Sequence, residues 1–315
     1  MRTRSPALVL AAALILAGCG GSGRGGADDG RLAVVATTTQ LADFTRAVGG
    51  DRVRVTGILK PNVDAHDFEP SPADIDAIAR AGVLVTNGLG LEEWLDDTIT
   101  ASGFEGTRVE AATGITPLAG GHAEEEHTGG QEHADEGTDP HVWQDVANAK
   151  VMVANIGRAL AAADPAGAAT YDANQRAYTA ELDALDAEIE REVATIPAAD
   201  RKLVTNHEAF NYYARAYHLE VVGSVIPSFD TSAELSVREV AELVDKIRAT
   251  GVKAVFSEAS LPPQTAETIG REAGVKVVAG EDALYGDSLG PDGSDAATYL
   301  AMMRHNTRVI VASLR

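Results

Sequence analysis

The sequence predicts an α/β protein of two lobes, each with a parallel sheet flanked by helices, joined by one long connecting helix. From residue 31 onward, short apolar segments alternate with helical periodicity, which is typical of βαβ units and parallel sheets. The alternation resumes after an alanine-rich stretch over 165–196 that carries apolar residues on one face. As a helix rising about 1.5 Å per residue, this stretch could span most of a domain's width. We therefore expect it to connect the two lobes.

The first lobe starts with a short apolar strand and continues with alternating elements. Ser71, Pro72 and Asp74 mark a helix start, because serine caps, proline fits the first position and an acidic side chain favours the positive end of the dipole. The predicted strands are 32–36, 53–59, 83–86 and 107–111, and the other predicted helices are 40–48, 92–100 and 148–160.

The second lobe repeats this pattern. Ser236 and Glu239 form a capping box for a helix that stops at Gly251. Another helix is expected between the last two strands. The predicted strands are 202–205, 221–225, 253–256 and 275–279, and a further helix is predicted at 209–217.

The chain divides into five expected parts. Residues 120–139 are acidic and contain nothing that could build a core, so we expect a solvated loop there. The parts are a signal peptide at 1–18, a lipidated cysteine and flexible tether at 19–30, an N-terminal lobe at 31–163 that contains this loop, a connecting helix at 164–197 and a C-terminal lobe at 198–315.

Cys19 is the only cysteine of the chain and follows a short apolar segment with two arginines before it. These features are those of a secretory signal, and the apolar segment is too short to span a bilayer stably. Leu16-Ala17-Gly18-Cys19 resembles a bacterial lipobox, which implies cleavage before Cys19 and a lipid on its thiol. The alternative is an ordinary cleaved signal with an incidental cysteine. Both place the working protein outside the cytoplasm, and the first anchors it to the membrane.

Composition narrows the possible partners. The formal net charge is −21, and nucleic acid is excluded as a partner because phosphate binding needs clustered Lys and Arg. A cationic ligand is compatible with this charge. One cysteine leaves no disulfide within the chain, so core burial must hold the fold, and we expect a monomer.

Chemistry-bearing side chains follow several predicted strands. His66, His207, Glu258 and Asp287 lie after strands, and His141 precedes a helix. In open α/β sheets, ligands bind beyond the carboxyl ends of strands. If each lobe contributes two of these side chains, they would meet in a cleft.

Four motifs resemble one known family in the right order and over nearly the whole mature length. The sequence is similar to the zinc- or manganese-binding solute-binding lipoproteins of bacterial ABC importers. This resemblance implies that His66, His141, His207 and Asp287 are metal ligands, and that the partners are a membrane permease and its cytoplasmic ATPase. The motifs are residues 63–70 (VDAHDFEP), 139–143 (DPHVW), 206–213 (NHEAFNYY) and 284–289 (LYGDSL).

The ligand set favours Zn²⁺ as the cargo. Three neutral imidazoles and one carboxylate suit tetrahedral zinc. In related manganese binders the third ligand is typically a carboxylate, whereas here it is His207. Zinc members of the family also often carry a His-rich acidic insertion before the second ligand, as this chain does. Manganese is the alternative, since some manganese-linked relatives share the three-histidine pattern.

The remaining candidates have competing interpretations. Glu258 either orients a ligand imidazole or is a charge at the end of a strand. His122, His127 and His133 either capture metal weakly or belong to a solvated tract. We expect His218 and His305 to be structural, and Trp143 and Tyr213 to pack around the site.

Two other functions compete with that of a receptor. If Asp287 stands away from the metal, the site is open to water, and Glu258 or Asp287 could act as the base of a zinc hydrolase. An adhesin is the second rival, but no repeat or exposed aromatic motif supports it. We expect a receptor and not an enzyme.

Overall fold

The computed structural model describes residues 30–118, 137–231 and 236–315. Residues 31–315 form one compact unit of the chain. The predicted signal peptide, Cys19, the tether through residue 29 and His122, His127 and His133 lie outside the described residues.

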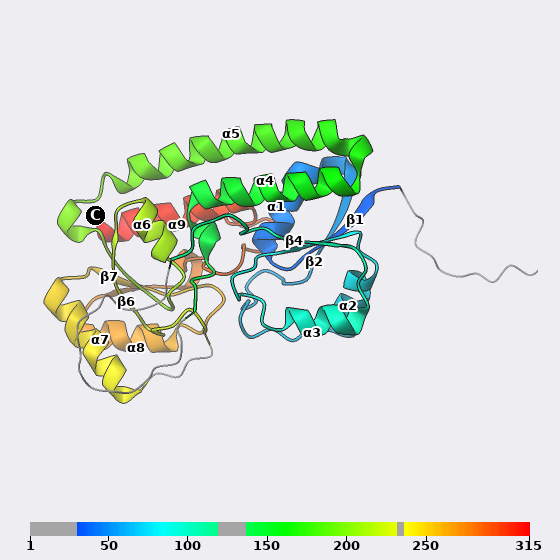
Figure 1. Cartoon of the computed structure of the whole chain (residues 1–315). Coiled ribbons are helices and arrows are strands. Elements are labelled where there is room, and N and C mark those ends of the chain that lie inside the picture. The colour runs from blue at the N-terminus through cyan, green and yellow to red at the C-terminus, as the bar shows by residue number, and fades with distance from the viewer. Residues whose placement is uncertain (1–29, 119–136, 232–235) are drawn as a thin grey trace, which may run out of the picture. The chain divides into compact units, whose positions relative to one another are not determined.

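The first lobe contains a four-stranded parallel sheet in the order β2-β1-β3-β4. Every residue of β3 is buried, because helices cover both faces of the sheet. Helices α1 and α4 share the main hydrophobic core with one face, while α2 and α3 form a smaller core on the other (Figure 1). The strands are β1 (Leu32–Ala36), β2 (Val53–Gly57), β3 (Val83–Thr86) and β4 (Thr107–Glu110), and the helices are α1 (Thr39–Gly49), α2 (Pro72–Ala79), α3 (Leu95–Ser102) and α4 (Val146–Ala163).

The second lobe contains two parallel strand pairs, β5 with β6 and β7 with β8. Strands β5 and β7 are neighbours, so the pairs lie next to each other. Helices α7 and α8 form a separate core on one side, and α6 and α9 contribute to the main core. The strands are β5 (Lys202–Thr205), β6 (Glu220–Ser224), β7 (Ala254–Phe256) and β8 (Lys276–Val278), and the helices are α6 (Asn211–Ala216), α7 (Val237–Thr250), α8 (Gln264–Ala273) and α9 (Tyr299–Leu314).

Helix α5 (Ala168–Val193) connects the two lobes and packs against α1, α4 and α9 (Figure 1). It begins later than predicted, because Pro165–Gly167 form a separate 3₁₀ turn capped by Asp164. Its apolar face is buried along its length and consists of Tyr171, Tyr178, Leu182, Leu185, Ile189 and Val193. The same core cluster contains residues from both lobes, such as Val34 and Phe256. The lobes therefore share one hydrophobic core.

The predicted helix starts are confirmed where local capping decides them. Ser71 and Asp74 form a complete capping box at α2, and Ser236 and Glu239 form another at α7. Helix α7 ends at a left-handed Gly251, as predicted. Four further 3₁₀ turns lie at Gly50–Arg52, Val142–Gln144, Ala198–Asp200 and Gly280–Asp282.

Several boundaries differ from the predictions where tertiary contacts intervene. Helix α3 starts at Leu95 instead of residue 92, because the Glu92 carboxylate accepts hydrogen bonds from the Thr37 hydroxyl and the Asn87 amide. Strand β2 ends at Gly57, although the amide of Ile58 still donates to Ala36. Helix α9 was not predicted. Across the part of the chain that the structure describes, no helix is long and apolar enough to cross a membrane.

His207 and His218 lie at opposite ends of α6 and do not share a helix. His207 lies before α6, which starts only at Asn211. His218 follows the end of that helix, is exposed and has φ of 59°, in the left-handed region. Helix α6 thus separates the two histidines, and His218 does not belong to the cluster described below.

Candidate metal centre

The structure brings together the four side chains that the motifs suggested. His66 lies in the loop after β2, His141 just before α4, His207 just after β5 and Asp287 in the loop after β8. One ligand atom from each lies within 4.8 Å of those of the other three. Among the residues that the structure describes, this is the only group of at least three His, Cys, Asp or Glu side chains arranged to hold a metal ion.

The three imidazoles face one another through Nε2. Nε2 of His141 is 3.2 Å from Nε2 of His66 and 3.3 Å from Nε2 of His207. Ligand atoms around a tetrahedral ion with bonds of 2.0–2.1 Å are about 3.3–3.4 Å apart. The spacing of the imidazoles therefore matches a first-row transition-metal ion held between them.

Both carboxylate oxygens of Asp287 face the same point. Oδ1 is 3.3 Å from Nε2 of His141, whereas Oδ2 is 3.4 Å from that of His207 and 3.9 Å from that of His66. Both oxygens are buried, and no hydrogen bond satisfies either. A buried anion without donors is costly unless a cation compensates it. Asp287 is therefore suited to bind a metal through one oxygen or both.

Two side chains hold the backbone of Gly286, the residue before Asp287, in place. The Gly286 carbonyl accepts hydrogen bonds from Nε1 of Trp143 at 3.0 Å and from Nε2 of Gln144 at 2.9 Å. A Cβ atom on Gly286 would lie 2.1 Å from Oε2 of Glu258, so a side chain at this position would displace the carboxylate that contacts His207. These contacts fix the loop that presents Asp287 to the imidazoles.

Two histidines are oriented by carboxylates. Nδ1 of His141 is 2.8 Å from Oδ1 of Asp139, and Nδ1 of His207 is 3.0 Å from Oε1 of Glu258. If each Nδ1 carries the hydrogen and donates to its carboxylate, the lone pair of Nε2 is free for a metal. Both Nε2 atoms point to the cluster, as this tautomer requires.

Burial and nearby charge set the protonation of the site. Burial lowers the pKa of His66 to about 4, despite the opposing charge of Asp287. Burial would also lower the pKa of His207, but Glu258 and Asp287 hold it well above its usual range, and Asp139 and Asp287 raise that of His141 in the same way. Although burial opposes ionisation of Asp287, the imidazoles hold its pKa well below the usual range. The metal-free site therefore favours an ionised Asp287 beside protonated His141 and His207, with His66 neutral.

Of the four candidate side chains, that of His66 alone is in contact with solvent. The side chains of His141, His207 and Asp287 are fully buried, while that of His66 is 8% exposed. His66 lines a cavity of about 490 Å³ together with residues 89–91 and 228–230. The ring of Phe229 in this wall lies 6.4 Å from that of His141, centroid to centroid.

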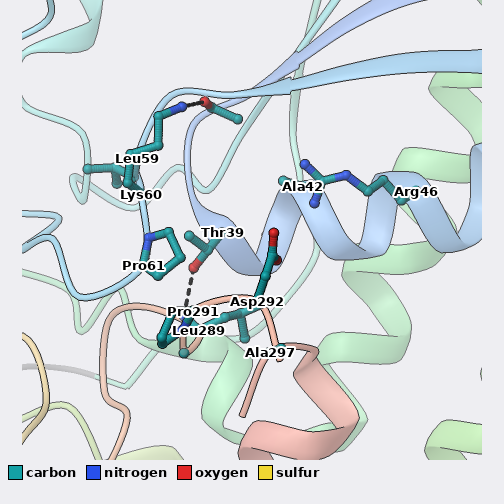
Figure 2. Close-up of a pocket in the computed structure, with 12 residues that line it drawn as sticks. Thr39, Ala42, Arg46, Leu59, Lys60, Pro61, Leu289, Pro291, Asp292 and Ala297 are labelled. Carbon is teal, nitrogen blue, oxygen red and sulfur yellow. Dashed lines mark hydrogen bonds between the residues drawn. The ribbon is translucent and has the colours of Figure 1, made fainter. Parts of the chain in front are cut away.

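A second cavity of about 260 Å³ contains none of the four ligand candidates (Figure 2). Arg46, Lys60 and Asp292 surround it. Its polar groups are already engaged in part, since the Lys60 amine donates to the Gly57 carbonyl and the Thr39 hydroxyl accepts from the Leu289 amide. It is therefore distinct from the candidate metal centre.

The other candidates from the sequence lie as follows. His305 is buried, with its ring nitrogens 3.0 Å from Asp295 and from the Ala283 carbonyl, as expected for a structural histidine. Trp143 packs against His141, with ring centroids 5.3 Å apart. Tyr213 pairs with Thr307 on α9.

Asp139 was missed as a partner of His141. A signal for it was present, because Asp64-Ala65-His66 and Asp139-Pro140-His141 share an Asp-x-His spacing. In both, the aspartate accepts a hydrogen bond from the amide of the histidine two residues later. This local turn, common for aspartate, fixes the backbone of each histidine.

Fold and site together define a two-lobed α/β solute-binding protein with a buried cluster suited to a divalent metal. A family model described as "Zinc-uptake complex component A periplasmic" matches residues 34–313. The chain therefore belongs to this family of metal-binding solute-binding proteins of ABC importers, and it is not an enzyme.

Relatives and solved structures agree with this assignment. The chain is similar to the manganese-binding lipoproteins MntA of Halalkalibacterium halodurans, with 34% identity over 98% of this chain and 97% of the relative, and of Bacillus subtilis, with 33% identity over the full length of both. It is also similar to the structure of the periplasmic zinc-binding protein TroA from Treponema pallidum, with a TM-score of 0.79, 28% identity and coverage of 90% of this chain and 99% of the other.

Proposed function

We propose that this protein is the extracytoplasmic receptor of an ABC importer, and that it captures a divalent transition-metal ion on His66, His141, His207 and Asp287. The observation that carries this proposal is the convergence of the four ligand atoms within 4.8 Å of one another. The receptor then delivers the ion to a membrane permease driven by an ATPase. Its site has four protein ligands, and this closed arrangement suits binding and release better than hydrolysis.

Manganese is the cargo that we propose first. Two relatives that match nearly the whole chain are named manganese-binding lipoproteins. The two unpartnered oxygens of Asp287 support this choice, because a carboxylate that binds through both oxygens raises the coordination number above four. Carboxylates are also among the ligands that suit Mn²⁺.

Zinc is the second candidate, and the three imidazoles support it. Their Nε2 separations of 3.2 and 3.3 Å are close to the edge of a tetrahedral zinc site. Zinc binds such a site more tightly than Mn²⁺, so affinity in vitro does not identify the physiological cargo.

The cargo is tested by metal analysis of the protein purified from its native envelope, from cells supplied with both metals. We expect manganese at one ion per chain. Zinc in its place would overturn the manganese assignment and restore the expectation from the ligand set. Protein without either metal, and unable to take one up, would overturn the receptor function itself.

His207→Glu tests the site in the same preparation. Replacing an imidazole by a carboxylate should weaken zinc binding while retaining Mn²⁺. Zinc retention equal to that of the wild type would show that His207 is not a ligand.

We further propose the anchor and the domain organisation expected from the sequence. A lipid on Cys19 would keep the receptor near its permease and raise its effective concentration there. The shared core beneath α5 favours lobes at 31–163 and 198–315 that move little about a helix at 164–197. Release of soluble protein by Cys19→Ala tests the anchor, and membrane retention of this variant would refute it.

A further inference from the structure

We propose that Tyr212, on α6, is a positioning residue for His141 and acts through Asp139. This inference rests on the proposed metal receptor, because it concerns how one of the four ligands is held. Among the described residues, the Tyr212 hydroxyl hydrogen bonds to Leu118 and Asp139, and neither is a ligand candidate. Asp139 is the residue that orients His141.

Asp139 is held from several directions at once. Its Oδ1 accepts from the amide of His141 at 3.0 Å and lies 2.8 Å from Nδ1 of the same residue. Its Oδ2 accepts from Nδ2 of Asn211 at 3.1 Å, and its carbonyl accepts from the Tyr212 hydroxyl at 3.0 Å. Two consecutive residues of α6 therefore hold the aspartate that holds His141.

The Tyr212 hydroxyl has a defined direction. It accepts a hydrogen bond from the Leu118 amide at 2.9 Å, so its own proton is directed to the Asp139 carbonyl. The Asp139 amide in turn donates to the Leu118 carbonyl at 3.1 Å. Tyr212 is fully buried, and the Arg215 guanidinium lies 5.3 Å from its ring centre. Water cannot readily replace this hydroxyl, so its loss leaves two backbone groups without their partner.

The position of α6 links the Tyr212 hydrogen bond to two of the candidate ligands. The helix starts four residues after His207, so one short segment carries a ligand of the second lobe and holds the segment of His141 in the first. The Nε2 atoms of these two histidines are 3.3 Å apart. Groups that orient a ligand imidazole typically change metal affinity by about 10–100-fold when they are removed.

Tyr212→Phe tests the inference, with Tyr213→Phe as the matched control. The two tyrosines are adjacent and fully buried, and each loses one hydroxyl, but that of Tyr213 pairs with Thr307 on α9, at 2.8 Å. Zinc affinity and dissociation rate are measured by chelator competition, and the Nδ1 proton of His141 is followed by NMR in the zinc-loaded protein. Zinc serves here as a diamagnetic probe.

We expect Tyr212→Phe to bind zinc about tenfold more weakly, through faster dissociation, and to shift the His141 Nδ1 proton or speed its exchange with water. Tyr213→Phe should change neither. Equal behaviour of the two variants, whether both weakened or both unaffected, would overturn the inference.

Asn211→Ala is the second variant if Tyr212→Phe does not fold. It removes the hydrogen bond to Oδ2 of Asp139 and a local one to the Glu208 carbonyl, within the turn that leads into α6. A smaller loss of zinc affinity with a shifted His141 Nδ1 proton supports positioning of His141 through Asp139, and wild-type affinity with an unchanged Nδ1 proton refutes it. A wild-type protein that binds no metal would instead refute the proposed function, which separates the two failures.

Discussion

At the scale of single residues, the candidate site depends on groups that hold each imidazole. A histidine binds a metal through one ring nitrogen. The hydrogen-bond partner of the other nitrogen fixes the tautomer and so decides which nitrogen is free to bind. Asp139 and Glu258 take this role for His141 and His207. The motifs pointed to all four candidate ligands, and the Asp-x-His spacing carried a signal for Asp139. Tyr212 could not be placed from the sequence, because its contact with Asp139 depends on how α6 packs.

Glu258→Gln should weaken metal binding by about tenfold or more, because an amide orients Nδ1 of His207 less well than a carboxylate. The matched control is Asp295→Asn, which changes the carboxylate beside His305, a histidine outside the cluster. Zinc affinity by chelator competition is the measurement. A loss of equal size in both variants would assign Glu258 a structural role only.

Metal binding should release protons near neutral pH. In the metal-free protein, carboxylates raise the pKa of His141 and His207 above that of free histidine, so these rings carry protons that the metal must displace. With a pKa of about 4, His66 should contribute no proton. Affinity should therefore fall as the pH drops, starting above the usual histidine value of about 6.5.

Titration calorimetry in buffers of different ionisation enthalpy counts these protons at pH 7. We expect a release of more than one proton per ion. Binding without proton release, or affinity undiminished at pH 5, would contradict the proposed ligand set.

At the scale of elements, alternating apolar segments and capping residues predicted most helices and strands, while non-local hydrogen bonds moved their ends. Glu92 shows why, since its contacts with Thr37 and Asn87 withdraw it from α3. The turn at His218 likewise needs a left-handed residue that the helical pattern does not reveal. The sequence also does not reveal how the acidic insertion is closed at its base, where the Asp139 amide donates to the Leu118 carbonyl.

Replacing residues 120–136 by a short Gly-Ser linker should leave the candidate metal centre intact. The bond between Leu118 and Asp139, together with Tyr212, closes the base of this insertion independently of its length. Zinc affinity at the main site and the unfolding midpoint are compared with a full-length variant in which His122, His127 and His133 are alanine. A loss of main-site affinity in the linker variant alone would show that the insertion supports the site.

At the scale of the whole molecule, the sequence predicts the α/β class with parallel sheets flanked by helices, and the structure confirms it. The sequence does not predict that both lobes share one core. Sequence periodicity shows which face of an element is apolar, and not which other element covers it. Phe44 on α1 packs edge-on against Tyr299 on α9, with ring centroids 4.8 Å apart. The Tyr299 hydroxyl also donates to the Trp143 carbonyl at 2.7 Å. Such contacts join the lobes.

Phe44→Ala should destabilise both lobes together, by about 3–5 kcal/mol, because it leaves a cavity in the shared core. Urea unfolding followed by fluorescence and by circular dichroism should give one coincident transition. Val237→Ala is the control, since this side chain is 89% exposed and its removal should cost little. Two separate transitions would show that the lobes unfold independently.

The proposed metal centre is tested most directly by the position of the ion in a crystal of the zinc-loaded protein, located by anomalous scattering at the zinc edge. We predict one strong peak at about 2.0–2.2 Å from Nε2 of His66, His141 and His207 and from an oxygen of Asp287. A peak bound by other side chains, or no peak between these four, would contradict the proposed site.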